Sequence, residues 1–128
     1  MKSEFEQQRI ESMLALGCCA CKVEADRFSS WPSASPECHH MLSGGRRMGH
    51  LFTIPLCAGH HRGDWTPEQK VYWRAQGIQY MPSIAGGRKS FVFHYGTERW
   101  FWEKTQEQLG LPIDWPESKV VARTVPKS

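Results

Sequence analysis

The sequence lacks a long hydrophobic run. None of its 128 residues belongs to a stretch that approaches the roughly 20 apolar residues of a membrane-spanning helix. Its first residues, Met1 to Glu6, carry charge where a secretory signal peptide has an apolar core. These two absences predict a soluble protein that stays in the cytoplasm and has no membrane partner.

The sequence also lacks an internal repeat and a clear domain linker. Its length predicts one domain with a modest core, and six Trp, six Phe and three Tyr indicate that this domain folds. The excess of basic residues is small, a formal net charge of +3, which permits a polyanionic partner without identifying one.

Cysteine occurs in an odd number, five, and three of the five lie between Cys18 and Cys21. In a reducing compartment this pattern is typical of metal binding rather than of disulfides. Cys57 and His60 stand three positions apart, as Cys18 and Cys21 do, and each spacing lets one turn offer two ligands to a zinc ion. We therefore predict a structural zinc bound by Cys18, Cys21, Cys57 and His60, with Cys19 as an alternative to Cys18. The competing interpretation is a set of buried free thiols and a surface histidine.

A second constellation of histidines surrounds this predicted zinc site, at His39, His40, His50 and His61. Neighbours on a flat strand point to opposite faces, so His39 and His40 cannot simply bind one ion together. At a twisted strand end, however, one can bind a metal while the other reaches an adjacent water. Neutral imidazole serves both purposes near pH 7, and His61 would add a second metal ligand. The alternative is solvated or capping histidines.

Periodicity and turn residues divide the chain into short elements of an α+β domain. Helices are expected at 4–16, 66–76, 88–95 and 98–109, with a short helical turn at 57–62. Strands are expected at 37–42 and 51–56, and Pro55 limits the second to an edge or a strand end. Loops are expected at 22–36, 43–49 and 78–87, followed by an irregular tail at 111–128. Trp100, Phe101 and Trp102 are expected in the core rather than stacked on bases, Cys38 is expected to be buried, and His94 has no assigned role.

Several motifs resemble those of a known family. They are Cys18-x-x-Cys21, His39-His40, Gly49-His50, Pro55-Leu56-Cys57-Ala58-Gly59-His60-His61, Gly87-Arg88-Lys89-Ser90-Phe91 and Tyr95-Gly96-Thr97-Glu98. Over roughly residues 18–105 the chain resembles the HNH nucleases with the ββα-metal fold, and most closely the phage Ref-type, RecA-dependent nucleases. The resemblance implies a single zinc-stabilised, treble-clef-like domain over 1–128, with 1–17 as an N-terminal helix and 111–128 as a C-terminal tail.

The resemblance also implies a role for each histidine of this second constellation. His40 takes the position of the general base that activates water. His39 and His61 take those of two ligands to a catalytic divalent metal, which would be Mg, Mn or Zn. His50 lies near the position that supports the base or the metal.

Five basic residues near these motifs are suited to contacts with DNA phosphates, which carry no sequence information. They are Arg46, Arg47, Arg62, Arg88 and Lys89. The alternative for each is a solvated surface charge.

Together these features predict a metal-dependent endonuclease that hydrolyses DNA phosphodiester bonds. The resemblance adds a RecA-type recombinase filament as a partner and the cytoplasm of a bacterial host cell as location, if the chain is of phage or prophage origin. One rival is a non-catalytic zinc-binding DNA module, which gives no reason for His39, His40 and His61. The other is a structural, regulatory or recombination accessory protein with a decayed site.

Overall fold

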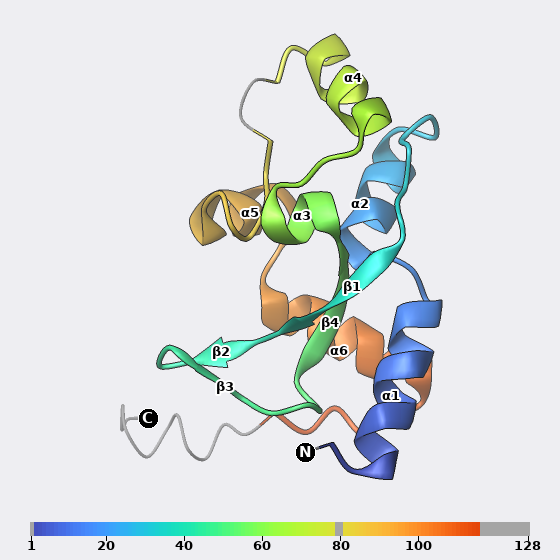
Figure 1. The fold of residues 1–128 in the computed structure, drawn as a ribbon, viewed down its shortest axis with the longest axis vertical. Helices are drawn as coiled ribbons and strands as arrows, with labels where there is room; N and C mark the ends of the chain where they lie inside the picture. Colours follow the sequence, from blue (N-terminus) through green and yellow to red (C-terminus); the bar gives the residue numbers. More distant parts are fainter. Residues whose placement is uncertain (1, 79–80, 116–128) are drawn as a thin grey trace.

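The computed structural model describes residues 2–78 and 81–115 (Figure 1). These residues form α1 (Glu4–Ala15), α2 (Cys19–Arg27), β1 (Pro36–His40), β2 (Leu42–Ser43), β3 (Arg46–Arg47), β4 (Thr53–Cys57), α3 (Ala58–Arg62), α4 (Pro67–Ala75), α5 (Arg88–Tyr95) and α6 (Glu98–Leu109). The predicted α+β class is confirmed. In the part of the chain that the structure describes, no helix has the length and apolar character needed to cross a membrane.

The centre of the fold is an antiparallel pair, β1 and β4, in which His39 lies opposite Ile54 and His40 opposite Thr53. Between them the chain makes a small hairpin of β2 and β3, which turns at two glycines with φ of 61° and 80°. Only glycine adopts such angles at little cost. Both strands of the central pair are edge strands, which confirms the placement expected for Pro55.

The pair continues directly into a short helix, because Cys57 ends β4 and caps α3. Helix α3 packs on β1 and β4, and α2 packs on β4 beside it. Helices α1 and α6 pack on each other and on the sheet (Figure 1). The order strand, strand, short helix therefore lies at the middle of the molecule, with the other helices around it.

Buried Arg9 joins α1 to this centre. Its guanidinium donates from Nη1 to Thr53 Oγ1 at 2.8 Å and from Nε to Gln106 Oε1 at 2.8 Å. Burial lowers its pKa to about 10. Thr53 in turn donates to the carbonyl oxygen of His50 at 3.3 Å, so one contact chain runs from α1 to a candidate site residue.

The four predicted helices correspond to α1, α4, α5 and α6, and their bounds are confirmed within two residues at each end. Side-chain caps at the start of three of them, α1, α4 and α6, explain why the local sequence pattern was sufficient there. Ser3, Thr66 and Thr97 each accept a backbone N–H of the first turn, from Glu6, Gln69 and Trp100.

The loop predicted over 22–36 is wrong for residues 22–27, which belong to α2. This helix begins because the Cys18 sulfur accepts the backbone N–H of Cys21. The polar residues of this helix suggested a loop, but one of them, Glu24, is buried, and its carboxylate contacts His94 Nε2 at 2.9 Å. The segment 43–49 is also not wholly irregular, because it contains Ser43 of β2 and all of β3.

The prediction of a buried aromatic cluster holds for Phe101 and Trp102 and is wrong for Trp100, which is 44% exposed. Three consecutive residues on a helix point in three directions, so they cannot all face one core. Cys38 is half-buried in β1 rather than buried. Residues 116–128 of the predicted tail lie outside the described part of the chain.

Candidate functional site

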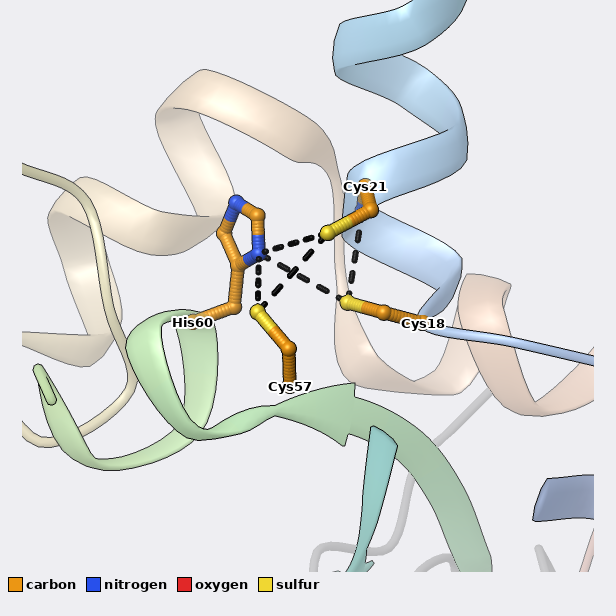
Figure 2. Close-up of side chains that lie close together, drawn as sticks. All are labelled: Cys18, Cys21, Cys57 and His60. Atoms are coloured by element: carbon orange, nitrogen blue, oxygen red, sulfur yellow. Dashed lines mark hydrogen bonds between the residues drawn. The ribbon is translucent and has the colours of Figure 1, made fainter. Parts of the chain in front are cut away.

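Four side chains that are distant in sequence meet where α2 begins and β4 becomes α3 (Figure 2). They are Cys18, Cys21, Cys57 and His60. All four are buried, and their ligand atoms lie within 4.8 Å of one another. The structure thus brings together the four residues predicted to bind zinc, and it places Cys18 rather than Cys19 in the cluster. Within residues 2–78 and 81–115, this is the only group of at least three Cys, His, Asp or Glu residues with such spacing.

The donor set and its spacing fit a tetrahedral zinc. Zn–S bonds of about 2.3 Å and Zn–N bonds of about 2.0 Å place the donor atoms about 3.5 to 3.8 Å apart. The Cys21 and Cys57 sulfurs are 3.7 Å apart, and His60 Nδ1 lies 3.6 Å from the Cys18 sulfur and 3.2 Å from that of Cys57. The cluster therefore needs little movement to bind such an ion.

The electrostatics of the cluster also favour a cation. Hydrogen bonds from Cys18 and Cys21 lower the pKa of Cys57, whereas burial raises that of Cys18. The cluster thus favours a thiolate at Cys57 in a buried site. On the far side of the imidazole, His60 Nε2 lies 2.8 Å from Tyr95 Oη, which orients the ring and leaves Nδ1 toward the sulfurs.

Aromatic rings enclose His60, which is fully buried. Trp31, Trp65 and Tyr95 lie with ring centroids 4.8 to 5.7 Å from its own. The residue before it must be glycine, because a Cβ atom on Gly59 would lie 2.2 Å from a Trp65 ring carbon. This packing fixes the direction in which α3 leaves the sheet.

A second group of predicted residues lines a pocket of about 400 Å³ beside this cluster. The predicted residues in its lining are His39, His40, Arg47, His61, Arg62 and Arg88. His50 is outside the lining but contacts His40, and exposed Arg46 and Lys89 are also outside the lining. The pocket therefore gathers three imidazoles and three guanidinium groups.

The two histidines predicted to bind metal are each held by a carboxylate. His39 Nε2 lies 2.8 Å from one oxygen of Glu98, and Arg88 donates to the other oxygen. His61 Nδ1 lies 2.9 Å from Glu37 Oε1, and Arg62 donates to both oxygens of that carboxylate.

These contacts keep both carboxylates ionised and leave one nitrogen of each imidazole for another partner. The hydrogen bonds from Arg62 lower the pKa of Glu37 to about 2. The rings of His39 and His61 lie close together, with centroids 4.9 Å apart and planes at 71°.

The predicted base, His40, contacts a different partner. Its Nε2 lies 3.1 Å from His50 Nδ1. Burial and the nearby charge of Arg47 lower the pKa of His40, so the ring is neutral at neutral pH. A neutral imidazole can accept a proton, which a protonated one cannot.

Sequence reasoning missed Glu98 and Tyr95 as neighbours of the predicted sites. Glu98 is 59 positions from His39, and Tyr95 is 35 from His60. No local spacing indicates such contacts. From the sequence alone, Glu98 is expected only to be an acidic residue in the first turn of a helix.

Residues 3–110 match the family model described as recombination enhancement, RecA-dependent nuclease. No curated protein matches the chain.

The geometry of the cluster predicts one tightly bound zinc per chain. Because metal binding and folding are coupled at such sites, Cys21→Ser should lose the zinc and lower the melting temperature sharply. Cys19→Ser, which removes a neighbouring thiol from outside the cluster, should keep both. Metal analysis and thermal unfolding of the freshly purified proteins test this, and wild-type protein without zinc would contradict it.

Proposed function

Since the chain belongs to the family of recombination enhancement, RecA-dependent nucleases, we propose that it is a metal-dependent HNH endonuclease that hydrolyses DNA phosphodiester bonds. The observation that carries the proposal is the pocket in which His39, His40 and His61 meet three arginines. A zinc-binding module without activity would need the Cys3His cluster but not this pocket. The family description also supports a role beside a RecA-type filament.

The central elements support the HNH assignment. In this proposal β1, β4 and α3 form the ββα unit of the site. Strand β1 supplies His39 and His40, and α3 supplies His61. The Cys3His cluster anchors the turn between β4 and α3, so a structural zinc there would hold the pocket residues in place.

We assign His39 Nδ1 and His61 Nε2 as the two nitrogens that would bind the catalytic divalent ion. The other nitrogen of each ring faces a carboxylate, an arrangement that most metal-binding histidines share because it fixes the ring orientation and tautomer. Two protein ligands leave the remaining positions for phosphate oxygens and water. When bound, such an ion would stabilise negative charge on the scissile phosphate and on the leaving oxygen.

His40 is the general base in this mechanism. If its Nε2–H donates to His50 Nδ1, then Nδ1 of His40 carries the lone pair that takes a proton from the attacking water. His50 acts through His40, because the contact sets the tautomer and orientation of the base.

The pocket arginines bind the DNA backbone. Arg62 and Arg88 pair with carboxylates yet remain 54% and 46% exposed, so their outer N–H groups can still reach phosphate oxygens. Arg46, Arg47 and Lys89 are exposed and extend this basic surface. Phosphate contacts of this kind position DNA without reading its sequence.

Variants of two pocket histidines separate an enzyme from a binding module. His40→Ala should lower the rate of plasmid nicking by about 10²-fold or more, because it removes the base. His61→Ala should also abolish nicking, and excess divalent metal should restore part of it, because only a ligand is lost. Excess metal should not rescue His40→Ala, whereas added imidazole should restore part of its activity.

Zinc content, melting temperature and DNA affinity should stay near wild type in both variants. Lys70→Ala, a change at an exposed position on α4 outside the pocket, serves as the control and should cut normally. Wild-type nicking by His40→Ala would refute its assignment as base.

The pH dependence of nicking follows from the same assignment. Only neutral His40 accepts a proton, so the rate should rise with pH through its pKa and then level off. Burial and Arg47 lower this pKa, so the plateau should begin below the ordinary histidine value of about 6.5. Arg47→Ala should move the rise toward higher pH. A wild-type rate that still climbs steeply above about pH 7 would argue against His40.

The salt dependence of DNA binding tests the phosphate contacts. A plot of log affinity against log salt concentration has a negative slope, and each lost phosphate contact should make that slope shallower by about 0.9. Arg46→Ala with Arg47→Ala should therefore reduce the slope by nearly twice that amount. Lys70→Ala with Arg74→Ala removes the same charge from exposed positions on α4 and should leave the slope unchanged. Strong sequence preference that persists at high salt would contradict this description.

A further inference from the structure

We propose that Glu98 is a positioning residue that holds His39 in the Nε2–H tautomer and so presents the Nδ1 lone pair to a divalent cation. The inference rests on the proposed function, because it concerns the same pocket. It adds a residue from α6, outside the ββα unit, and it gives the physical reason why Nδ1 is the ring nitrogen left for the ion.

The contacts of Glu98 are direct and enclosed. Its Oε1 lies 2.8 Å from His39 Nε2, and the side chains of Glu98 and His39 are only 12% and 6% exposed. Arg88 donates through Nε to the second oxygen, Oε2. Glu98 is the first residue of α6, whose preceding residue, Thr97, caps the helix and fixes where the carboxylate emerges. Little water competes for these bonds.

The charge state of Glu98 decides which way the hydrogen bond runs. Its second oxygen, Oε2, pairs with the Arg88 guanidinium, and this permanently charged partner favours the ionised carboxylate. The carboxylate is therefore ionised at neutral pH and can only accept hydrogen bonds. A neutral His39 must then carry its hydrogen on Nε2, and Nδ1 keeps a lone pair.

Replacing Glu98 by glutamine should invert this tautomer. Glutamine has nearly the same shape but offers one oxygen and one NH2 group. Arg88 can only donate, so the amide oxygen should turn to Arg88 and the NH2 group to His39. His39 Nε2 must then accept, its hydrogen moves to Nδ1, and that nitrogen can no longer bind a cation.

Arg88 is the residue that forces this change of tautomer in His39. In Arg88→Ala with Glu98→Gln, the amide oxygen is free to face His39 and the Nε2–H tautomer should return. Arg88→Ala alone provides the baseline, because Arg88 also contributes to phosphate binding. Glu103→Gln is the matched control, since Glu103 lies on the same helix and pairs with Arg99 at the surface.

The direct test is 15N NMR of the histidine side chains in zinc-loaded protein without added catalytic metal, with His39 identified by its loss in His39→Ala. We expect Nε2–H in wild type, Glu103→Gln, and Arg88→Ala with Glu98→Gln, and Nδ1–H in Glu98→Gln. Zinc content shows whether each variant is folded. A Glu98→Gln protein in which His39 keeps the Nε2–H tautomer would overturn the proposal, and so would an Nδ1–H tautomer in wild type.

Binding of Mn2+, measured by electron paramagnetic resonance of the free ion, gives a second measurement that does not depend on cleavage. Glu98→Gln should weaken Mn2+ binding by about 10- to 100-fold, the usual cost of losing a partner of a metal-binding histidine. The double variant should bind like Arg88→Ala. Equal Mn2+ affinity in Glu98→Gln and wild type, while His39→Ala loses the ion, would overturn the role of Glu98.

These outcomes separate the inference from the proposed function. A wild-type protein with the expected tautomers and Mn2+ affinities that never cuts DNA would support the role of Glu98 and refute the nuclease proposal. A protein that nicks DNA with unchanged tautomer and affinity in Glu98→Gln would refute only the role of Glu98.

Discussion

The turn in which β4 becomes α3 is the constraint on which the rest of the structure depends. Cys57 and His60 in this turn meet Cys18 and Cys21 from the start of α2, and all four are buried. Adjacent residues of a helix point in different directions, so His60 enters this cluster while His61 faces the pocket. A zinc ion held by the cluster therefore also sets the direction of a candidate catalytic side chain. In a domain with short elements and a modest core, that anchoring contributes directly to folding.

The pocket shows how charged groups are accommodated at a partly buried site. Each carboxylate that contacts a histidine also pairs with an arginine, Glu98 with Arg88 and Glu37 with Arg62. Without the arginine, burial would raise the pKa of each acid and weaken the charged contact that orients its histidine. The arginines thus stabilise the carboxylates and keep exposed N–H groups, which in the proposed function would contact phosphate. In the proposed mechanism, DNA binding and metal-site geometry would be coupled through these arginines.

Local patterns in the sequence were sufficient for the helices with clear caps and for the four residues of the Cys3His cluster. They failed where long-range contacts decide the outcome. Helix α2 was missed because its buried acid, Glu24, finds its partner His94 only in the folded chain. The contact of Glu98 with His39 has no signature in spacing. Trp100 was expected in the core because three consecutive aromatics suggested burial, although a helix presents only part of its surface to the core.

Anomalous X-ray diffraction from crystals grown with Mn2+ tests the central claim most directly, because it locates both ions in one experiment. The anomalous peak that is lost when the X-ray energy is lowered from just above to just below the zinc edge should lie amid the Cys3His cluster. The peak that remains below the zinc edge and is lost below the manganese edge should lie in the pocket, bonded to His39 Nδ1 and His61 Nε2, with His40 beside it and not bonded to it. A zinc peak elsewhere, or a manganese peak bonded to His40, would contradict the account.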